Sequence, residues 1–245
     1  MRRSALGDGD VQVTTNQGFV KSRSRIGKFA TLFGFLCLVA GLGLTWVRQD
    51  LVYVSYLTLL PGYILISYGG YNTVRWGTKP RIDEALAQSL KTLDHRFQLF
   101  NYVNGLPADN MLLTPTSVVV FEIRPFMGEF RNTGSKWRRK FTALGVFMSI
   151  TEGGLGNPTR DAERKAAETK QFLVRRFGEE ADAIRVEPFV VFTHPRATLV
   201  LQDPAVPVAT AKDLRGAIRT GDRRERIPGQ LYRRLARILK DPEAA

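Results

Sequence analysis

The segment Ala108–Arg124 reads ADNMLLTPTSVVVFEIR and decides the fold, because it holds two apolar runs joined by a short turn. We expect strands at Asn110–Thr114 and Ser117–Arg124, the second with a β-branched run. If the hairpin turns at the Pro-Thr pair between them, Asp109 faces Glu122 across the two strands. One face of this hairpin then carries an apolar stripe that ends in two opposed carboxylates.

Two carboxylates in this position need a counter-charge. Directly opposite side chains on antiparallel strands have Cβ atoms roughly 4.5–5.5 Å apart, and like charges at that distance repel. A hard divalent ion such as Mg²⁺, held by Asp109 and Glu122, would relieve the repulsion. The alternative is a salt bridge of Glu122 with Arg124, which shares its face of the strand, and of Asp109 with another cation. The hairpin alone leaves both interpretations open.

The same residues resemble the nuclease-related domain (NERD) family. That family has an Asp, a hydrophobic strand, a turn and a strand ending in Glu-x-Lys, with a Gly nearby that corresponds to Gly128 here. The resemblance extends upstream to Glu84, and downstream to Trp137 and to Asn157-Pro158. It implies the wider PD-(D/E)xK nuclease fold, so we expect a restriction-endonuclease-like domain with a mixed sheet.

The resemblance also implies roles for the site residues. Asp109 and Glu122 would hold Mg²⁺, Glu84 would support the ion through water, and the residue two positions after Glu122 would orient the attacking water. That residue is Arg124 instead of Lys, and Asp161 stands where the family has Gln. Arginine can clamp a phosphate but cannot accept a proton. The candidate catalytic set is therefore Glu84, Asp109, Glu122 and Arg124, and its departures favour binding of DNA or RNA over efficient phosphodiester hydrolysis.

Two uncharged stretches, Phe29–Val47 and Leu51–Tyr71, are each long enough to cross a bilayer. Their short connection predicts a two-helix transmembrane hairpin over residues 29–71. Basic residues flank both outer ends, which places both termini in the cytoplasm, as at the plasma membrane of a bacterium. A cleaved signal peptide is disfavoured by the long polar leader and by the poor cleavage site Thr-Trp-Val-Arg. Residues 1–28 are expected to be a flexible cytoplasmic arm.

The charge balance indicates a polyanionic partner. The 245 residues include 36 Lys and Arg against 23 Asp and Glu, a net charge of +13. Nucleic acid and the anionic face of a membrane both fit this balance. The single cysteine, Cys37, excludes an internal disulfide framework and a cysteine-rich zinc module. The sequence has no Walker A, GxGxxG, GxSxG or HExxH motif, so we expect no nucleotide cofactor.

The remaining pattern predicts one α/β (α+β) domain. Helices are expected at Arg81–Leu93 and Thr159–Phe177, and further strands at Phe97–Val103 and Val186–Phe192. The order helix, three strands, helix, strand gives a mixed sheet. We assign residues 76–203 to this NERD-like domain and residues 204–245 to a basic C-terminal helical extension.

A cluster of basic and aromatic residues follows the hairpin, and phosphate contacts would use such charges. The candidate nucleic-acid-binding residues are Lys136, Trp137, Arg138, Arg139 and Lys140. The alternative function is a non-enzymatic membrane scaffold or complex subunit. Its domain would bind a protein partner, such as a membrane protein, or anionic lipid of the bilayer.

Overall fold

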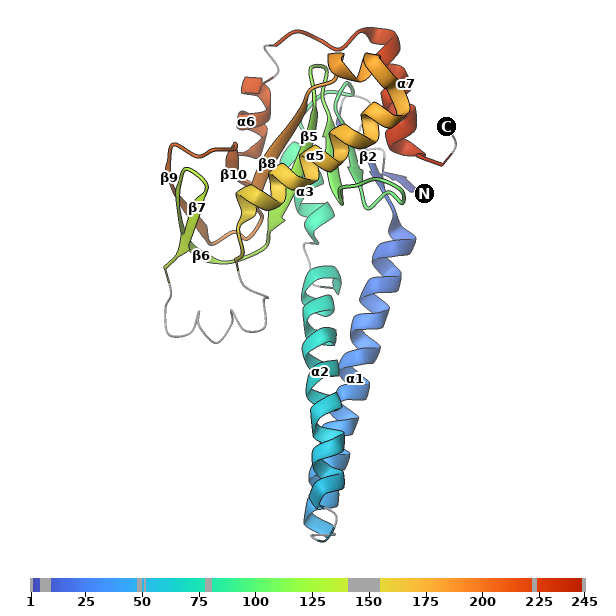
Figure 1. Cartoon of the computed structure of the whole chain (residues 1–245), viewed down its shortest axis with the longest axis vertical. Helices are drawn as coiled ribbons and strands as arrows, with labels where there is room; N and C mark the ends of the chain where they lie inside the picture. Colours follow the sequence, from blue (N-terminus) through green and yellow to red (C-terminus); the bar gives the residue numbers. More distant parts are fainter. Residues whose placement is uncertain are drawn as a thin grey trace. The chain divides into compact units, whose positions relative to one another are not determined.

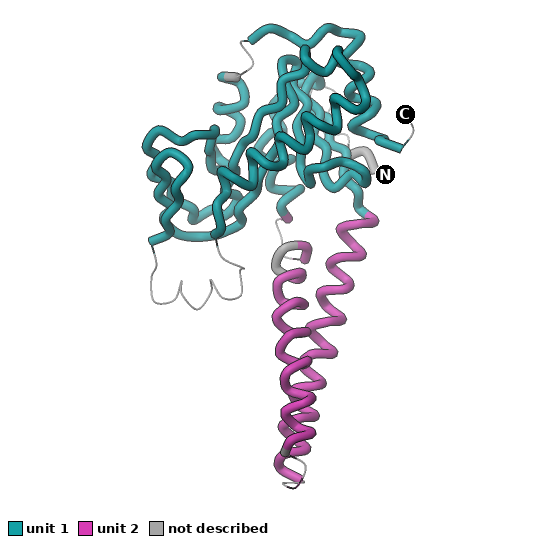
Figure 2. Tube along the Cα trace, viewed as in Figure 1, with its two compact units in different colours: residues 1–17, 82–145, 155–245 teal, residues 18–81, 146–154 magenta. Residues whose placement is uncertain are grey.

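The computed structural model describes residues 2–4, 10–47, 50, 52–77, 81–140, 155–221 and 224–243. The chain divides into two compact units (Figure 2). The first unit contains residues 1–17, 82–145 and 155–245, and the second contains residues 18–81 and 146–154.

The first unit is built on a seven-stranded mixed sheet, which confirms the predicted α+β class. The strand order is β1-β2-β3-β4-β5-β8-β10. The pairs β2–β3, β5–β8 and β8–β10 are parallel, whereas β1–β2, β3–β4 and β4–β5 are antiparallel. The strands are β1 (Arg2–Ser4), β2 (Gln12–Thr15), β3 (Gln98–Asn101), β4 (Asn110–Leu113), β5 (Val118–Arg124), β8 (Val186–Phe192) and β10 (Val208–Thr210).

Helices cover both faces of this sheet (Figure 1). α5 (Pro158–Phe177) and α7 (Gly229–Lys240) pack on the face that carries Met111 and Val120. α3 (Ile82–Leu90) and α6 (Leu214–Gly221) pack on the face that carries Leu112 and Phe121. The split follows from strand geometry, because successive side chains point to opposite faces. A 3-10 helix, η2 (Gly178–Ala183), follows α5.

A second, three-stranded sheet extends from the end of β5. Its order is β7 (Lys136–Arg139), β6 (Gly128–Thr133) and β9 (Ala197–Gln202). β6 pairs antiparallel with β7 and parallel with β9. Its inner face packs through Phe130, whose ring centroid lies 4.6 Å from that of Phe192 on β8. The outer face is exposed to solvent.

Two segments outside the predicted domain pair and pack with it in the structure. The expected flexible arm, residues 1–28, contains β2, which pairs with β3 and buries Val11 and Val13 in the core. The expected C-terminal extension, residues 204–245, contributes β10 to the main sheet. It also contributes α7, whose Leu231, Leu235, Ile238 and Leu239 join the core below α5. Both segments are parts of the domain because backbone pairing and apolar burial hold them there.

The second unit consists of two antiparallel helices, α1 (Gln17–Val47) and α2 (Val52–Gly77). Glycines let them approach closely. A Cβ on Gly34 would lie 2.8 Å from the carbonyl oxygen of Gly62, and a Cβ on Gly41 would lie 2.5 Å from Oγ1 of Thr58. Such contacts exclude larger side chains at both positions, so the glycines define the packing of the pair.

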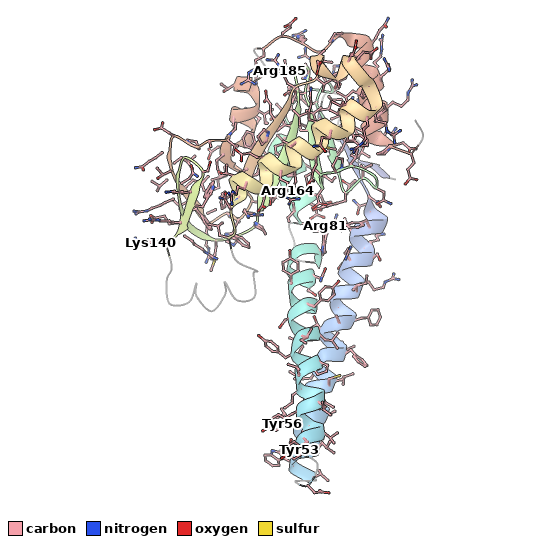
Figure 3. The ribbon with its side chains drawn as sticks, in the orientation of Figure 1. Tyr53, Tyr56, Arg81, Lys140, Arg164 and Arg185 are labelled. Atoms are coloured by element: carbon pink, nitrogen blue, oxygen red, sulfur yellow. The ribbon has the colours of Figure 1, made fainter. Side chains whose placement is uncertain are left out.

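Within the described part of the chain, only α1 is long and apolar enough to cross a membrane. The predicted two-span hairpin, Phe29–Val47 and Leu51–Tyr71, is therefore supported for one span and not for two. The apolar run of α2 is interrupted by several tyrosines, by serines and by Pro61. Two of those tyrosines, Tyr53 and Tyr56, are exposed along α2 (Figure 3).

Candidate functional site

The hairpin of β4 and β5 has the predicted register. Met111 pairs with Val120 and Leu113 with Val118. The Pro-Thr tip keeps this register because hydroxyls close the turn: Oγ1 of Thr114 accepts hydrogen bonds from the backbone N–H groups of Thr116 (3.2 Å) and Ser117 (2.9 Å). No extra residue enters the strands, so β5 directs Glu122 and Arg124 to the face that α5 covers.

Glu122 is a buried carboxylate that is held between two cations. The residue is 4% exposed. Its Oε1 accepts a hydrogen bond from Nη1 of Arg124, and Nζ of Lys165 lies 2.8 Å from Oε2. The lysine contact is an ion pair without a well-directed hydrogen bond, since Oε2 has no hydrogen-bond partner. A buried carboxylate keeps its charge only where such partners replace water.

Arg124 is fixed by three acceptors. Besides Glu122, its Nη2 donates to Oδ2 of Asp161 at 2.5 Å, and its Nε donates to the carbonyl oxygen of Leu155 at 3.2 Å. The two departures from the NERD pattern, Arg124 and Asp161, thus bind each other. The motif position that would present a lysine to phosphate instead presents a guanidinium, each of whose three nitrogens already donates a hydrogen bond within the protein.

Helix α5 supplies Asp161 and Lys165 from one side. Asn157 caps the helix by accepting from the backbone N–H of Arg160 at 3.2 Å, and Pro158 begins it. Asp161 and Lys165 are four residues apart and therefore lie on the same face of the helix. Lys165 was not among the candidate residues from the sequence. The four-residue spacing places Lys165 on the same helix face as Asp161, but it does not show that this face meets Glu122.

The other two expected carboxylates come from elements outside the ion pairs of Glu122 with Arg124 and Lys165. The paired residues of β4 and β5 end at Met111 and Val120, so Asp109 lies beyond the last pair. Asp109 would lie opposite Glu122 if the same register continued past that pair. Asp109 is half-buried, and its backbone carbonyl accepts from the N–H of Tyr102. Glu84 lies on α3, which packs on the other face of the sheet from Glu122.

The donor set does not fit Mg²⁺. Magnesium requires several oxygen ligands in octahedral geometry at about 2.0–2.1 Å. Here a cation occupies each oxygen of Glu122, and Oδ2 of Asp161 is engaged by Arg124. Among the described residues, no group of three or more acidic, histidine or cysteine side chains is arranged to hold an ion. The contacts therefore resemble the salt-bridge alternative more closely than the metal site.

The five candidate nucleic-acid-binding residues divide between the two faces of β7. Lys136, Arg138 and Lys140 are exposed, whereas Trp137 and Arg139 point inward. Nε1 of Trp137 donates to Oγ1 of Thr159 at 2.8 Å. The Arg139 guanidinium lies over the ring of Phe130 at 5.5 Å and donates to a backbone carbonyl. Trp137 and Arg139 thus make contacts within the protein, and their role in nucleic-acid binding stays a prediction.

The exposed face gains a fourth cation from the neighbouring strand. Arg131 on β6 is directly opposite Arg138 on β7. We call the exposed side chains Arg131, Lys136, Arg138 and Lys140 the basic ribbon. Glu129 partly offsets their charge: its Oε1 lies 2.7 Å from Nε of Arg131, and its Oε2 lies 3.8 Å from Nζ of Lys140. The hydrogen bond from Arg131 lowers the pKa of Glu129 below its ordinary value.

Comparison with known proteins gives one family match. Residues 81–193 match the family model described as Nuclease-related domain, NERD. This part of the chain, from α3 to the end of β8, therefore supports placement in the NERD family, as the motif around Glu122 predicted. No curated protein and no solved structure matches the chain. The helices α1 and α2, strand β10 and helix α7 lie outside the matched segment.

Proposed function

We propose that the chain is a membrane-attached protein whose nuclease-related domain binds nucleic acid through the basic ribbon. The observation that carries the proposal is the pair of arginines, Arg131 and Arg138, directly opposite each other on an exposed face. Like charges in that position are unfavourable. A phosphate between them would relieve the repulsion with charge-assisted hydrogen bonds.

The composition of this face indicates which part of a nucleic acid it would contact. Single-stranded nucleic acid is commonly held by stacking bases on aromatic side chains. The aromatic residue of β7, Trp137, is turned inward and bonded to Thr159, so the basic ribbon offers only cations. We therefore assign it to the phosphate backbone, which gives binding that does not depend on base sequence. Hydrolysis is not part of the proposal.

The membrane part of the proposal rests on α1 and on the pairing of β2 with β3. β2 precedes α1 in the chain, β3 follows α2, and the two strands are adjacent in one sheet. One crossing alone would put these paired strands on opposite sides of the bilayer. If α1 crosses, the chain must cross again before β3, and α2 is the helix available to do so. The exposed apolar side chains of α2, among them Leu57 and Ile64, support a lipid-facing surface.

With two crossings, both ends of the chain and the nuclease-related domain lie on the same side of the bilayer, and the basic residues that flank the helices favour the cytoplasmic side. This topology is tested by labelling with a membrane-impermeant maleimide in a Cys37→Ser background. We expect Asp50→Cys, between the helices, to react in intact cells. We expect Ser135→Cys, in the turn between β6 and β7, to react only after permeabilisation. Reaction of both or of neither in intact cells would contradict two crossings.

Nucleic-acid binding is tested with the full chain in neutral nanodiscs and a fluorescent DNA duplex. We expect Lys136→Ala/Arg138→Ala to bind at least tenfold more weakly than wild type. The matched control is Arg164→Ala, which removes an exposed cation of α5 that pairs with Glu168 and does not belong to the basic ribbon. Equal affinity of the double variant and the wild type would refute the proposal. Binding of the wild type to anionic vesicles but not to duplex would favour the lipid alternative.

A further inference from the structure

The charges around Glu122 balance within the protein. Two acids, Glu122 and Asp161, alternate with two bases, Arg124 and Lys165, in a continuous chain of contacts. The side chains of Glu122 and Arg124 are only 6% and 14% exposed. A buried carboxylate in this position needs positive charge from its surroundings, and here β5 and α5 both supply it.

We propose that Arg124 and Lys165 are built-in counter-cations of Glu122, which occupy both of its oxygens and make the nuclease-related domain of this chain independent of divalent metal. Lys165 is a positioning residue in this arrangement. Its ion pair with Glu122 connects α5 to the end of β5, and the ion pair of Asp161 with Arg124 fixes the position of the guanidinium. The inference does not depend on nucleic-acid binding.

The chemistry of the two cations makes the arrangement persistent. The guanidinium of arginine is a delocalised cation with donors in a rigid fork, which suits an ion pair with buried carboxylates. The planar fork of Arg124 is shared between two carboxylates and the carbonyl oxygen of Leu155. A divalent ion at Glu122 would have to displace Arg124 or Lys165. It would then lie beside a remaining buried cation, which is electrostatically unfavourable.

The first test is Mn²⁺ binding by the wild-type full chain in detergent micelles, followed by electron paramagnetic resonance. We expect no stoichiometric binding and no shift of the thermal midpoint with Mg²⁺, Mn²⁺ or a chelator. Glu129→Gln is the matched control, since Glu129 is an arginine-paired glutamate on an exposed strand. One equivalent of Mn²⁺ bound by the wild type and lost in Glu122→Gln, but not in Glu129→Gln, would overturn the proposal.

The second test is a double-mutant cycle between Glu122 and Lys165, using the midpoint of unfolding. Glu122→Gln leaves Lys165 and Arg124 partly uncompensated, and Lys165→Met leaves an excess negative charge at Glu122. We expect the double variant to lose clearly less than the sum of the two single losses, because it removes a matched pair. Additive losses would show that Lys165 is no counter-cation of Glu122. If a variant fails to fold, Mn²⁺ binding by the wild type still decides.

Discussion

The salt dependence of duplex binding gives a quantitative test of the basic ribbon. Each phosphate that a cation neutralises contributes about −0.9 to the slope of log K against log salt for duplex DNA. The basic ribbon has Arg131, Lys136, Arg138 and Lys140 on one exposed face. If each contacts one phosphate, the wild-type slope is about −3.6, and that of Arg138→Ala is about −2.7.

These slopes predict different losses of affinity on raising the salt concentration. Between about 50 and 200 mM salt, the wild type should weaken roughly 150-fold and Arg138→Ala roughly 40-fold. The assay is fluorescence anisotropy of a labelled duplex with the full chain in neutral nanodiscs, titrated at four salt concentrations. Two unrelated duplex sequences should give the same slope, because phosphate contacts carry no base information.

Arg164→Ala is the control for the loss of one positive charge. Arg164 on α5 and Lys140 after β7 lie on different elements (Figure 3). Its removal lowers the net charge of the protein equally but leaves the basic ribbon intact. A slope that falls by the same amount in Arg164→Ala and Arg138→Ala would refute the assignment of phosphate contacts to the basic ribbon. An unchanged slope in Arg138→Ala would refute it as well.

Three further predictions concern charge and stability. Glu129→Gln should tighten duplex binding, because it releases Arg131 and Lys140. Because the pKa of Glu129 is lowered, its carboxylate stays charged between neutrality and pH about 5. Protonation of Glu129 should therefore tighten duplex binding by the wild type only at more acid pH. Leu239→Ala should lower the free energy of unfolding by about 2–5 kcal/mol in denaturant unfolding. The reason is that this residue of α7 is fully buried in the core. A loss of only about 0.5 kcal/mol, as at a surface position, would contradict the prediction. Burial raises the pKa of Tyr232, so the folded state holds the phenol proton more tightly. Its contribution to stability is present below the ordinary tyrosine pKa of about 10 and is lost as the pH rises toward the raised value. Tyr232→Phe should remove that alkaline loss in unfolding experiments, and an unchanged profile would contradict it.

The hairpin of β4 and β5 could be predicted from the sequence because local signals agree there. Apolar runs define both strands, and the short Pro-Thr connection leaves little freedom for another register. The turn itself is unusual, since Pro-Thr is not a favoured two-residue tip. The hydroxyl of Thr114 stabilises it by accepting from two backbone N–H groups. The family resemblance around Glu122 rests on the same short stretch.

The division of residues 136–140 between two faces was also accessible from the sequence. Side chains alternate along a strand, so Lys136, Arg138 and Lys140 must share a face, and Trp137 and Arg139 must share the other. The prediction of one cluster of five residues did not take this alternation of side chains into account. The inward direction of Trp137 depends on its contact with Phe192, whose ring centroid lies 5.5 Å away, and only the fold provides that contact.

Other features depend on long-range contacts that the sequence does not reveal. The strand β2 reads QVTT, and its β-branched residues favour a strand. Its parallel partner β3 lies far away in the sequence, so the pairing is not visible locally. Lys165 contacts Glu122 only because the packing of α5 on the sheet brings this residue of the helix next to the end of β5. The register of a helix against a sheet is set by packing of the whole domain, and no local pattern specifies it.

Flotation of a labelled duplex with the reconstituted protein tests the central claim most directly. The full chain is incorporated into neutral phosphatidylcholine vesicles and mixed with duplex and Mg²⁺ at low salt. The vesicles are then floated through a density gradient. We predict that the duplex floats with the wild type and is recovered uncleaved, and that it stays at the bottom with Lys136→Ala/Arg138→Ala. Duplex that stays at the bottom with the wild type, or that is cleaved in a manner abolished by Glu122→Gln, would contradict the account.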